Sequence, residues 1–237
     1  MRRVFEHGIK IGEKHTYDDW GLVCTRIEIS DPEQKTYFVE IPGRDGVIDL
    51  SEALVGDVKY GNREIRMEFI RRQDNRTLWH IRSSDISDYC HGQRRKLILD
   101  SDRSYYYEGR LKAETEKNFQ GVDCFTISAN VEPYKYERYS SLEPWVWDTF
   151  CFEDGIIRNY KDLEVNGTMT LLIPGRRKKV VPVMDCSAAM TLGYGGRTYY
   201  LPVGRSKIVD LQLGAGEHYL TFQGTGRVSV EYRGARL

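Results

Sequence analysis

The chain has 237 residues, of which 40% are hydrophobic and 30% are charged, and this composition is typical of a globular protein and excludes a disordered or fibrous one. Its 35 Lys and Arg residues balance its 35 Asp and Glu residues, so no overall positive field favours nonspecific binding to nucleic acid or to an anionic membrane. The length fits one large β domain or two of ordinary size.

The chain begins with short alternating segments that predict strands. One face of the first strand carries Val23, Thr25, Ile27 and Ile29, and the other carries Cys24, Arg26 and Glu28. A second strand, 37–41, ends at the turn sequence PGRDG (42–46), and apolar residues resume at 47–50. Glycine and proline at such a turn predict a β-hairpin.

The next predicted strand turns Ile65, Met67 and Phe69 inward, whereas the intervening Arg66 and Glu68 face water. One good helix follows. It starts near Asp74 or Asn75, either of which can cap its first turn, and stops near Gly92. Its apolar face consists of Leu78, Trp79, Ile86, Tyr89 and Cys90. We expect this helix to cover one side of a sheet.

Further strands are predicted at 96–99, 105–111 and 124–129, which makes the first half a β-rich α+β unit with one helix. The segment 131–144 has two prolines and no periodicity, and it predicts a boundary between domains 1–137 and 138–237. The second domain has no helix signal. Its predicted strands are 145–152, 168–173, 179–185, 198–203, 208–211, 218–223 and 227–232. This pattern predicts a β-sandwich or jelly roll.

The residues form no recognisable catalytic constellation, because the common nucleophile, phosphate-loop and zinc motifs are all absent. The histidines have no spacing suited to a metal, and the odd number of widely spaced cysteines indicates reduced thiols. We therefore expect no enzyme activity, no metal and no cofactor. The sequence also lacks a signal peptide and an apolar membrane span, which predicts that the protein is made and kept in a cytoplasm-like compartment or leaves it by lysis.

Two local features have a structural and a functional interpretation. The basic run GRRKK (175–179) is expected to be the solvated tip of a hairpin, with a surface for an acidic partner as the alternative. Trp145 and Trp147 lie on one strand face, where they fit core packing or a platform for sugar rings. The sixteen tyrosines are typical of a protein that forms interfaces.

Several sequence strings, taken in order, resemble one family, the distal tail proteins of long-tailed, noncontractile bacteriophages. The strings are KHTYDDWGL (14–22), EIPGRDGVIDL (40–50), YGNREIRMEF (60–69), the helix with Trp79, HGQRRKLILDSDRSYYYEGR (91–110) and EPYKYER (132–138). The closing sequence 214–237 is similar to the end of the same family.

The resemblance implies an N-terminal β-rich domain that assembles into a hexameric ring, and a C-terminal galectin-like β-sandwich at its periphery. It also implies a location at the distal end of the virion tail after synthesis in the host cytoplasm. The ring would dock on the major tail protein with one face and carry tail-tip or tail-associated proteins, with or without a receptor-binding protein, on the other. Its lumen would let DNA pass without sequence-specific binding.

The leading hypothesis is therefore a structural ring subunit of a phage tail tip. Candidate ring contacts are the turn residues Arg44, Asp45, Tyr60, Asn62 and Arg63. One alternative is a carbohydrate-binding adhesin module that contacts the host surface through Trp145 and Trp147. Another is a cell-wall hydrolase that uses Asp100 and Glu153.

Overall fold

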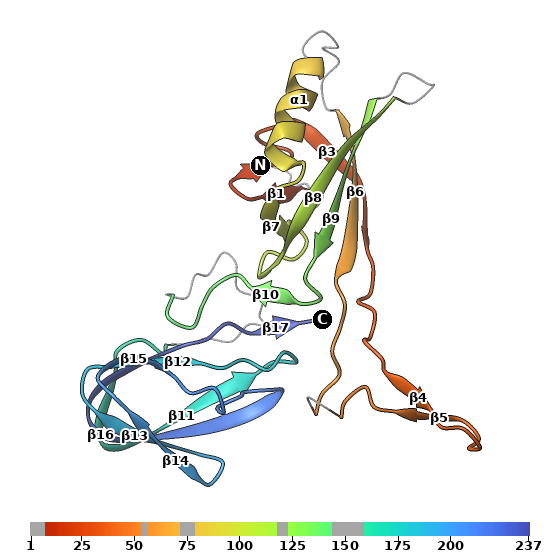
Figure 1. Cartoon of the computed structure of the whole chain (residues 1–237). Coiled ribbons are helices and arrows are strands. Elements are labelled where there is room, and N and C mark those ends of the chain that lie inside the picture. Colours follow the sequence, from red (N-terminus) through yellow and green to blue (C-terminus); the bar gives the residue numbers. More distant parts are fainter. Residues whose placement is uncertain (1–7, 54–55, 72–78, 118–122, 144–158) are drawn as a thin grey trace. The chain divides into compact units, whose positions relative to one another are not determined.

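The computed structural model describes residues 8–53, 56–71, 79–117, 123–143 and 159–237. They form two compact units (Figure 1). Both units are mainly β, which confirms the predicted fold class. The first unit holds the chain up to Asp102, then Tyr107–Pro133 and the last residue, whereas the second holds Arg103–Tyr106 and Tyr134–Arg236. Within the described residues, no helix is long and apolar enough to cross a membrane.

The first unit consists of an antiparallel sheet, a separate hairpin and the predicted helix. Its elements are β1 (Ile9–Ile11), β2 (Lys14–His15), β3 (Leu22–Ile29), β4 (Phe38–Glu40), β5 (Val47–Asp49), β6 (Arg63–Arg71), α1 (Trp79–Cys90), β7 (Arg94–Leu99), β8 (Tyr105–Lys117) and β9 (Asp123–Val131). The strand order in the sheet is β2-β1-β7-β8-β9-β6-β3, and β4 pairs only with β5.

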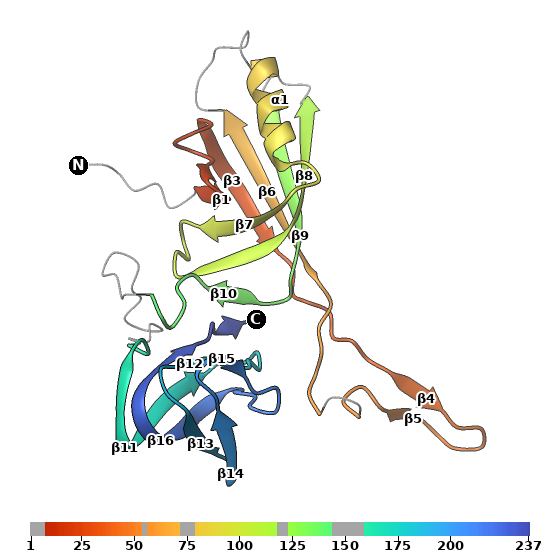
Figure 2. The ribbon, with the colours of Figure 1, turned by 60° about the vertical axis from the view of Figure 1, so that its left-hand side comes forward.

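Helix α1 covers one face of this sheet, as Figure 2 shows. Trp79, Ile86 and Cys90 are buried in the core with Phe69 and Phe125, and the Trp79 ring meets Phe125 edge to face at 6.2 Å. The predicted apolar face is thus confirmed for these helix residues. Gly92 has a φ of 72°, which ends the helix where the sequence predicted. The predicted N-cap at Asp74 or Asn75 and the apolar Leu78 lie outside the described residues.

Strand β3 differs from its predicted two-face pattern. Leu22 and Cys24 face the core, whereas Thr25 is exposed, and a β-bulge interrupts the pairing with β6 between Cys24 and Arg26. Beyond this bulge Ile27 packs against the core. A bulge adds one residue to one strand, so the alternation changes face at that point. The prediction that Val23 and Thr25 share a face with Ile27 was therefore wrong.

Because two thiols are buried in this core, we expect the free energy of unfolding to change with pH in the alkaline range. Burial raises the pKa of the Cys24 thiol to about 11 and that of Cys90 to about 12, from an ordinary value of 9.0. Their stabilising contribution is fully present below pH 9 and is lost as the pH rises through the folded values, because only the unfolded chain then releases the protons. We expect the urea midpoint to fall above pH 9, and to fall less steeply in the double variant Cys24→Ala, Cys90→Ala. Equal slopes would contradict this assignment.

The second unit is built around one long strand. Its elements are β10 (Lys135–Glu137), β11 (Leu163–Gly175), β12 (Val183–Cys186), β13 (Met190–Tyr194), β14 (Arg197–Leu201), β15 (Gly204–Lys207), β16 (Gly216–Glu231) and β17 (Ala235–Arg236). Strand β16 pairs with β11 along one edge, and with β13 and then β12 along the other. The order is β14-β13-β16-β12-β15, and side chains from both halves of β16 fill one core.

Three details of this unit correct the sequence predictions. Segments 218–223 and 227–232 are parts of the single strand β16 and not two strands separated by a turn. Strand β13 was missed, and the predicted strand at 208–211 is a turn in which the Leu211 amide donates to the Ile208 carbonyl at 3.0 Å. Leu211 is nevertheless buried. The turn therefore places an apolar side chain in the core, and its sequence resembles that of a strand.

Glycine explains why β16 continues where the sequence suggested a turn. Gly224 has a φ of 148°, and a Cβ added there would lie 2.9 Å from the Met190 Cβ. We expect Gly224→Ala to destabilise the second unit by about 1–3 kcal/mol, since both the backbone and the neighbour must shift. In the matched variant Gly193→Ala, on β13, the new Cβ has no neighbour closer than 3.7 Å. Urea unfolding should separate the two variants, and equal losses would contradict this account.

A buried ion pair links β10 to the segment after β11. The Arg176 Nε donates to the Glu137 Oε1 at 3.1 Å, and the Gly234 amide donates to Oε2 at 3.0 Å. Only 14% of the Arg176 side chain and 10% of the Glu137 side chain are exposed. Strands β11 and β12 do not pair with each other. The basic run 175–179 is therefore not the solvated hairpin tip that the sequence predicted.

Candidate assembly surface

A hairpin on a two-stranded stem extends from the first unit, and we call residues 33–61 the arm. Its stem is held by hydrogen bonds from the Lys35 amide to the Lys59 carbonyl and from the Gly61 amide to the Glu33 carbonyl, both 2.8 Å. Its outer part is the β4–β5 ribbon, in which Phe38 pairs with Asp49, Val39 with Ile48 and Glu40 with Val47. Gly43 and Gly46 have φ values of 83° and 74°, which the tight turn requires.

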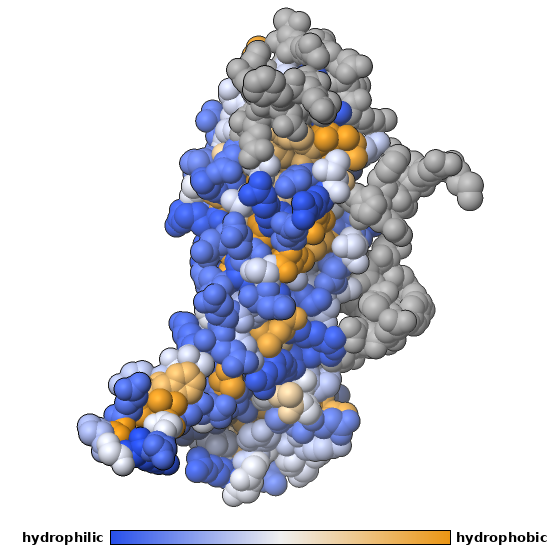
Figure 3. Space-filling model, turned by 90° about the vertical axis from the view of Figure 1, so that its right-hand side faces the viewer, coloured by the Kyte–Doolittle hydropathy of each residue, from blue (hydrophilic) through white to orange (hydrophobic). Residues whose placement is uncertain are grey.

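The arm has no core of its own. None of its described residues is buried, and a two-stranded ribbon is marginally stable in water. Several of its large apolar side chains are highly exposed, including Tyr37 at 64%, Phe38 at 52% and Val47 at 50%. Figure 3 shows hydrophobic side chains at the surface of this arm, at the lower left. Contiguous exposed apolar surface of this kind marks an interaction site.

The apolar side chains are concentrated on one side of the ribbon. Val39 and Ile48 are directly opposite each other and so share a face. Alternation places Tyr37 and Leu50 on the same face, and the Leu50 amide donates to the Tyr37 carbonyl at 2.9 Å. The opposite face is mixed, because it carries the exposed Phe38 and Val47 together with Glu40 and Asp49. We call Tyr37, Val39, Ile48 and Leu50 the apolar face of the arm.

The structure distributes the predicted ring contacts along this arm and its base. Arg44 and Asp45 are exposed at the hairpin tip. Tyr60 is in the stem, where it forms a β-bridge with Gln34, and the exposed Asn62 donates from Nδ2 to the Asn130 Oδ1 at 2.6 Å.

Arg63 differs from the other four candidates because it is buried, with its guanidinium carbon 5.9 Å from the centre of the Tyr107 ring. Its Nε has no hydrogen-bond partner among the described residues. The role of all five residues in a ring contact stays a prediction.

Sequence reasoning missed the apolar face of the arm as a site. The alternation of Tyr37, Val39 and Ile41 predicts a strand, which the structure contains as β4, but a strand pattern alone implies a core behind it. The informative signal was the short, isolated hairpin between two turn-rich segments. Such a hairpin has too few neighbours in the sequence to bury its own apolar side chains.

The two alternative functions rest on four candidate residues. Trp145, Trp147 and Glu153 lie outside the described residues. The Asp100 Oδ2 accepts a hydrogen bond from the His15 Nε2 at 3.2 Å. Within the part of the chain that the structure describes, no group of three potential metal ligands occurs.

Comparison with known proteins finds the fold but no sequence relative. No family model matches the chain, and no curated protein matches it. Among solved structures, the chain is similar in fold to a phage hub protein, which agrees with the fold that the sequence resemblance implied. The matching structure is the crystal structure of SPP1 Dit (gp 19.1), described as a paradigm of the hub adsorption apparatus in phages that infect Gram-positive bacteria. The match has a TM-score of 0.64 and 13% identity, and it covers 97% of this chain and 99% of SPP1 Dit.

Proposed function

We propose that this chain is a structural subunit of the tail tip of a long-tailed, noncontractile phage, located in the virion at the distal end of the tail. The observation that carries the proposal is the apolar face of the arm on a chain with the fold of SPP1 Dit. Such a subunit acts by assembly and docking and needs no catalytic residues, so the chain is not an enzyme.

The proposed assembly is a homo-hexameric ring built by residues 1–137. Closed cyclic symmetry requires a heterologous interface, in which one surface of a subunit contacts a different surface of its neighbour. We take the arm as the first of these surfaces, because none of its described residues is buried and Tyr37 and Leu50 of its apolar face are exposed. Burial of Tyr37, Val39, Ile48 and Leu50 against a neighbour removes this apolar area from water.

The ring joins the tail tube to the tip. One face docks on the major tail protein, and the other carries the tail-tip or tail-associated protein and, where present, a receptor-binding protein. The lumen lets DNA pass. Residues 138–237 form a galectin-like sandwich at the periphery of the ring.

The test is the mass of the purified protein in solution, combined with electron microscopy of the particles. We expect a particle of six subunits of 27.6 kDa each, with a central opening. A second sample contains tail tubes made of the major tail protein, because a ring can close on such a template. A protein that remains a monomer at high concentration and also fails to bind tube ends would overturn the proposal.

A further inference from the structure

A basic hollow lies on the second unit, entirely within residues of that unit. Its volume is about 570 Å³, which is within the range of natural binding sites. Five cations line it, and Glu231 is its one carboxylate. The cations are Lys178, Lys179, Arg205, Lys207 and Arg233. Since the whole chain has a formal net charge of zero, this is a local excess of positive charge.

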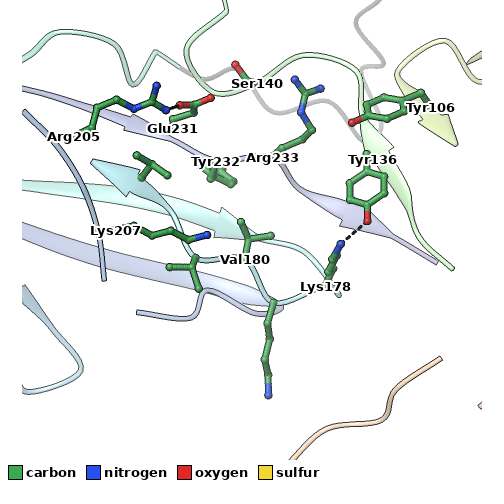
Figure 4. A pocket seen from close by; sticks show the side chains of 13 residues that line it. Tyr106, Tyr136, Ser140, Lys178, Val180, Arg205, Lys207, Glu231, Tyr232 and Arg233 are labelled. Atoms are coloured by element: carbon green, nitrogen blue, oxygen red, sulfur yellow. Dashed lines mark hydrogen bonds and ion pairs between the residues drawn. The ribbon is translucent and has the colours of Figure 1, made fainter. Parts of the chain in front are cut away.

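Apolar side chains line the hollow together with these cations, namely Val180, Val181 and Val183. The ammonium of Lys207 lies beside Val180, as Figure 4 shows. A charge beside apolar side chains is screened less than one in open water, so it attracts an anion more strongly.

The cations differ in the ion pairs and hydrogen bonds that they make within their own chain. Arg205 donates to the Glu231 Oε2 at 2.5 Å, and Arg233 donates from Nη1 to the carbonyls of Glu137 and Arg138, both at 2.5 Å. The Lys178 ammonium donates to the Tyr136 hydroxyl and lies 4.4 Å from the centre of its ring. Lys207 makes no ion pair with a described residue, so its charge is the most available to a ligand.

The hollow borders an open sheet edge. Strand β15 pairs with β12 and is the last strand in its sheet among the described residues. Val203 and Val209 flank it, and they are 66% and 70% exposed. An open edge offers unpaired backbone groups to an incoming extended segment, which can add to the sheet as a further strand.

From this juxtaposition we propose that β15 and the basic hollow together dock an acidic, extended segment of a partner protein. The segment adds to β15 through its backbone, and its alternate side chains then lie beside Arg205 and Lys207, since directly opposed residues in a sheet share a face. Carboxylates at those positions meet the cations of the hollow, and its apolar residues contact Val203 and Val209.

Charge also explains why the partner is not a second copy of the same edge. Two β15 strands placed edge to edge would bring Arg205 and Lys207 of both copies together, and like charges oppose such pairing. The same two residues attract an acidic strand. This proposal does not depend on the ring, because β15 and the arm belong to different units.

The test is fluorescence anisotropy of a labelled peptide of about ten residues, alternating Glu and Thr, titrated with the full chain. We expect saturable binding that weakens with salt. Lys207→Glu should weaken the binding by about ten-fold or more, since the attraction between residue 207 and a peptide carboxylate becomes a repulsion. The matched control is Arg197→Glu, which makes the same charge change on β14, the opposite edge strand of the same sheet. This control should change affinity by less than about two-fold.

Further samples separate the proposal from its competitors. A peptide with proline in place of each threonine keeps its charge but loses every second backbone donor, so we expect it to bind much more weakly. Equal weakening by both protein variants, or equal binding of the proline peptide, would overturn docking at β15. So would binding of polyphosphate without binding of the peptide. The variant Lys207→Ala could instead self-associate and not bind the peptide. The cations would then serve to prevent pairing between two β15 edges, and this result would also overturn the proposal.

Discussion

Replacing the apolar face of the arm by threonine is expected to abolish ring assembly and to leave the subunit folded. The variant combines Tyr37→Thr, Val39→Thr, Ile48→Thr and Leu50→Thr, and threonine keeps the strand preference of the ribbon. If each lost side chain removes about 1 kcal/mol of apolar burial, the four together weaken each subunit contact by roughly a thousand-fold. The particle mass should then fall from six subunits to one.

The subunit itself should barely change, because no described residue of the arm belongs to the core of its own unit. We expect the free energy of unfolding to stay within about 0.5 kcal/mol of the original value. The matched control is Phe38→Thr with Val47→Thr, on the face of the ribbon that also carries Glu40 and Asp49. Assembly should largely survive in this control. A four-threonine variant that still forms rings, or a control that loses them equally, would contradict the role of the apolar face.

The arm shows which properties the sequence could predict. Local alternation and the PGRDG turn predicted its hairpin, and the same periodicity predicted the buried side of β6 at Ile65, Met67 and Phe69, each fully buried. Both are short-range properties of the chain. Whether an apolar face is covered is a long-range property, so the exposure of the arm required the structure.

Long-range pairing also explains the errors in the second unit. The glycines at 224 and 226 have the composition of a turn, but β11 pairs with β16 on both sides of them, from Leu163 with Val228 to Gly175 with Gly216. The bulge in β3 is a similar case, since the register with β6 decides which face each residue occupies. The site at β15 arises in the same way, because Lys178 and Lys207 come from separate segments.

The largest effect on stability is expected from the buried pair of Glu137 and Arg176. Glu137→Ala removes the carboxylate that accepts hydrogen bonds from Arg176 and from the Gly234 amide. A charge that loses its partner inside a protein is costly, so we expect the second unit to be destabilised by about 3–5 kcal/mol. Glu137→Gln should cost less, because its side-chain oxygen can still accept one of the two hydrogen bonds.

Burial, rather than proximity of the charges, decides this outcome. The control is Glu231→Ala, which breaks the pair with Arg205. The Arg205 side chain is 65% exposed and the Glu231 side chain is 41% exposed. An exposed pair contributes about 1 kcal/mol or less, since water screens both charges. Hydrogen exchange resolved by peptide measures both variants in the second unit alone. If Glu137→Ala lowered protection there no more than Glu231→Ala does, the pair would not contribute as its burial implies.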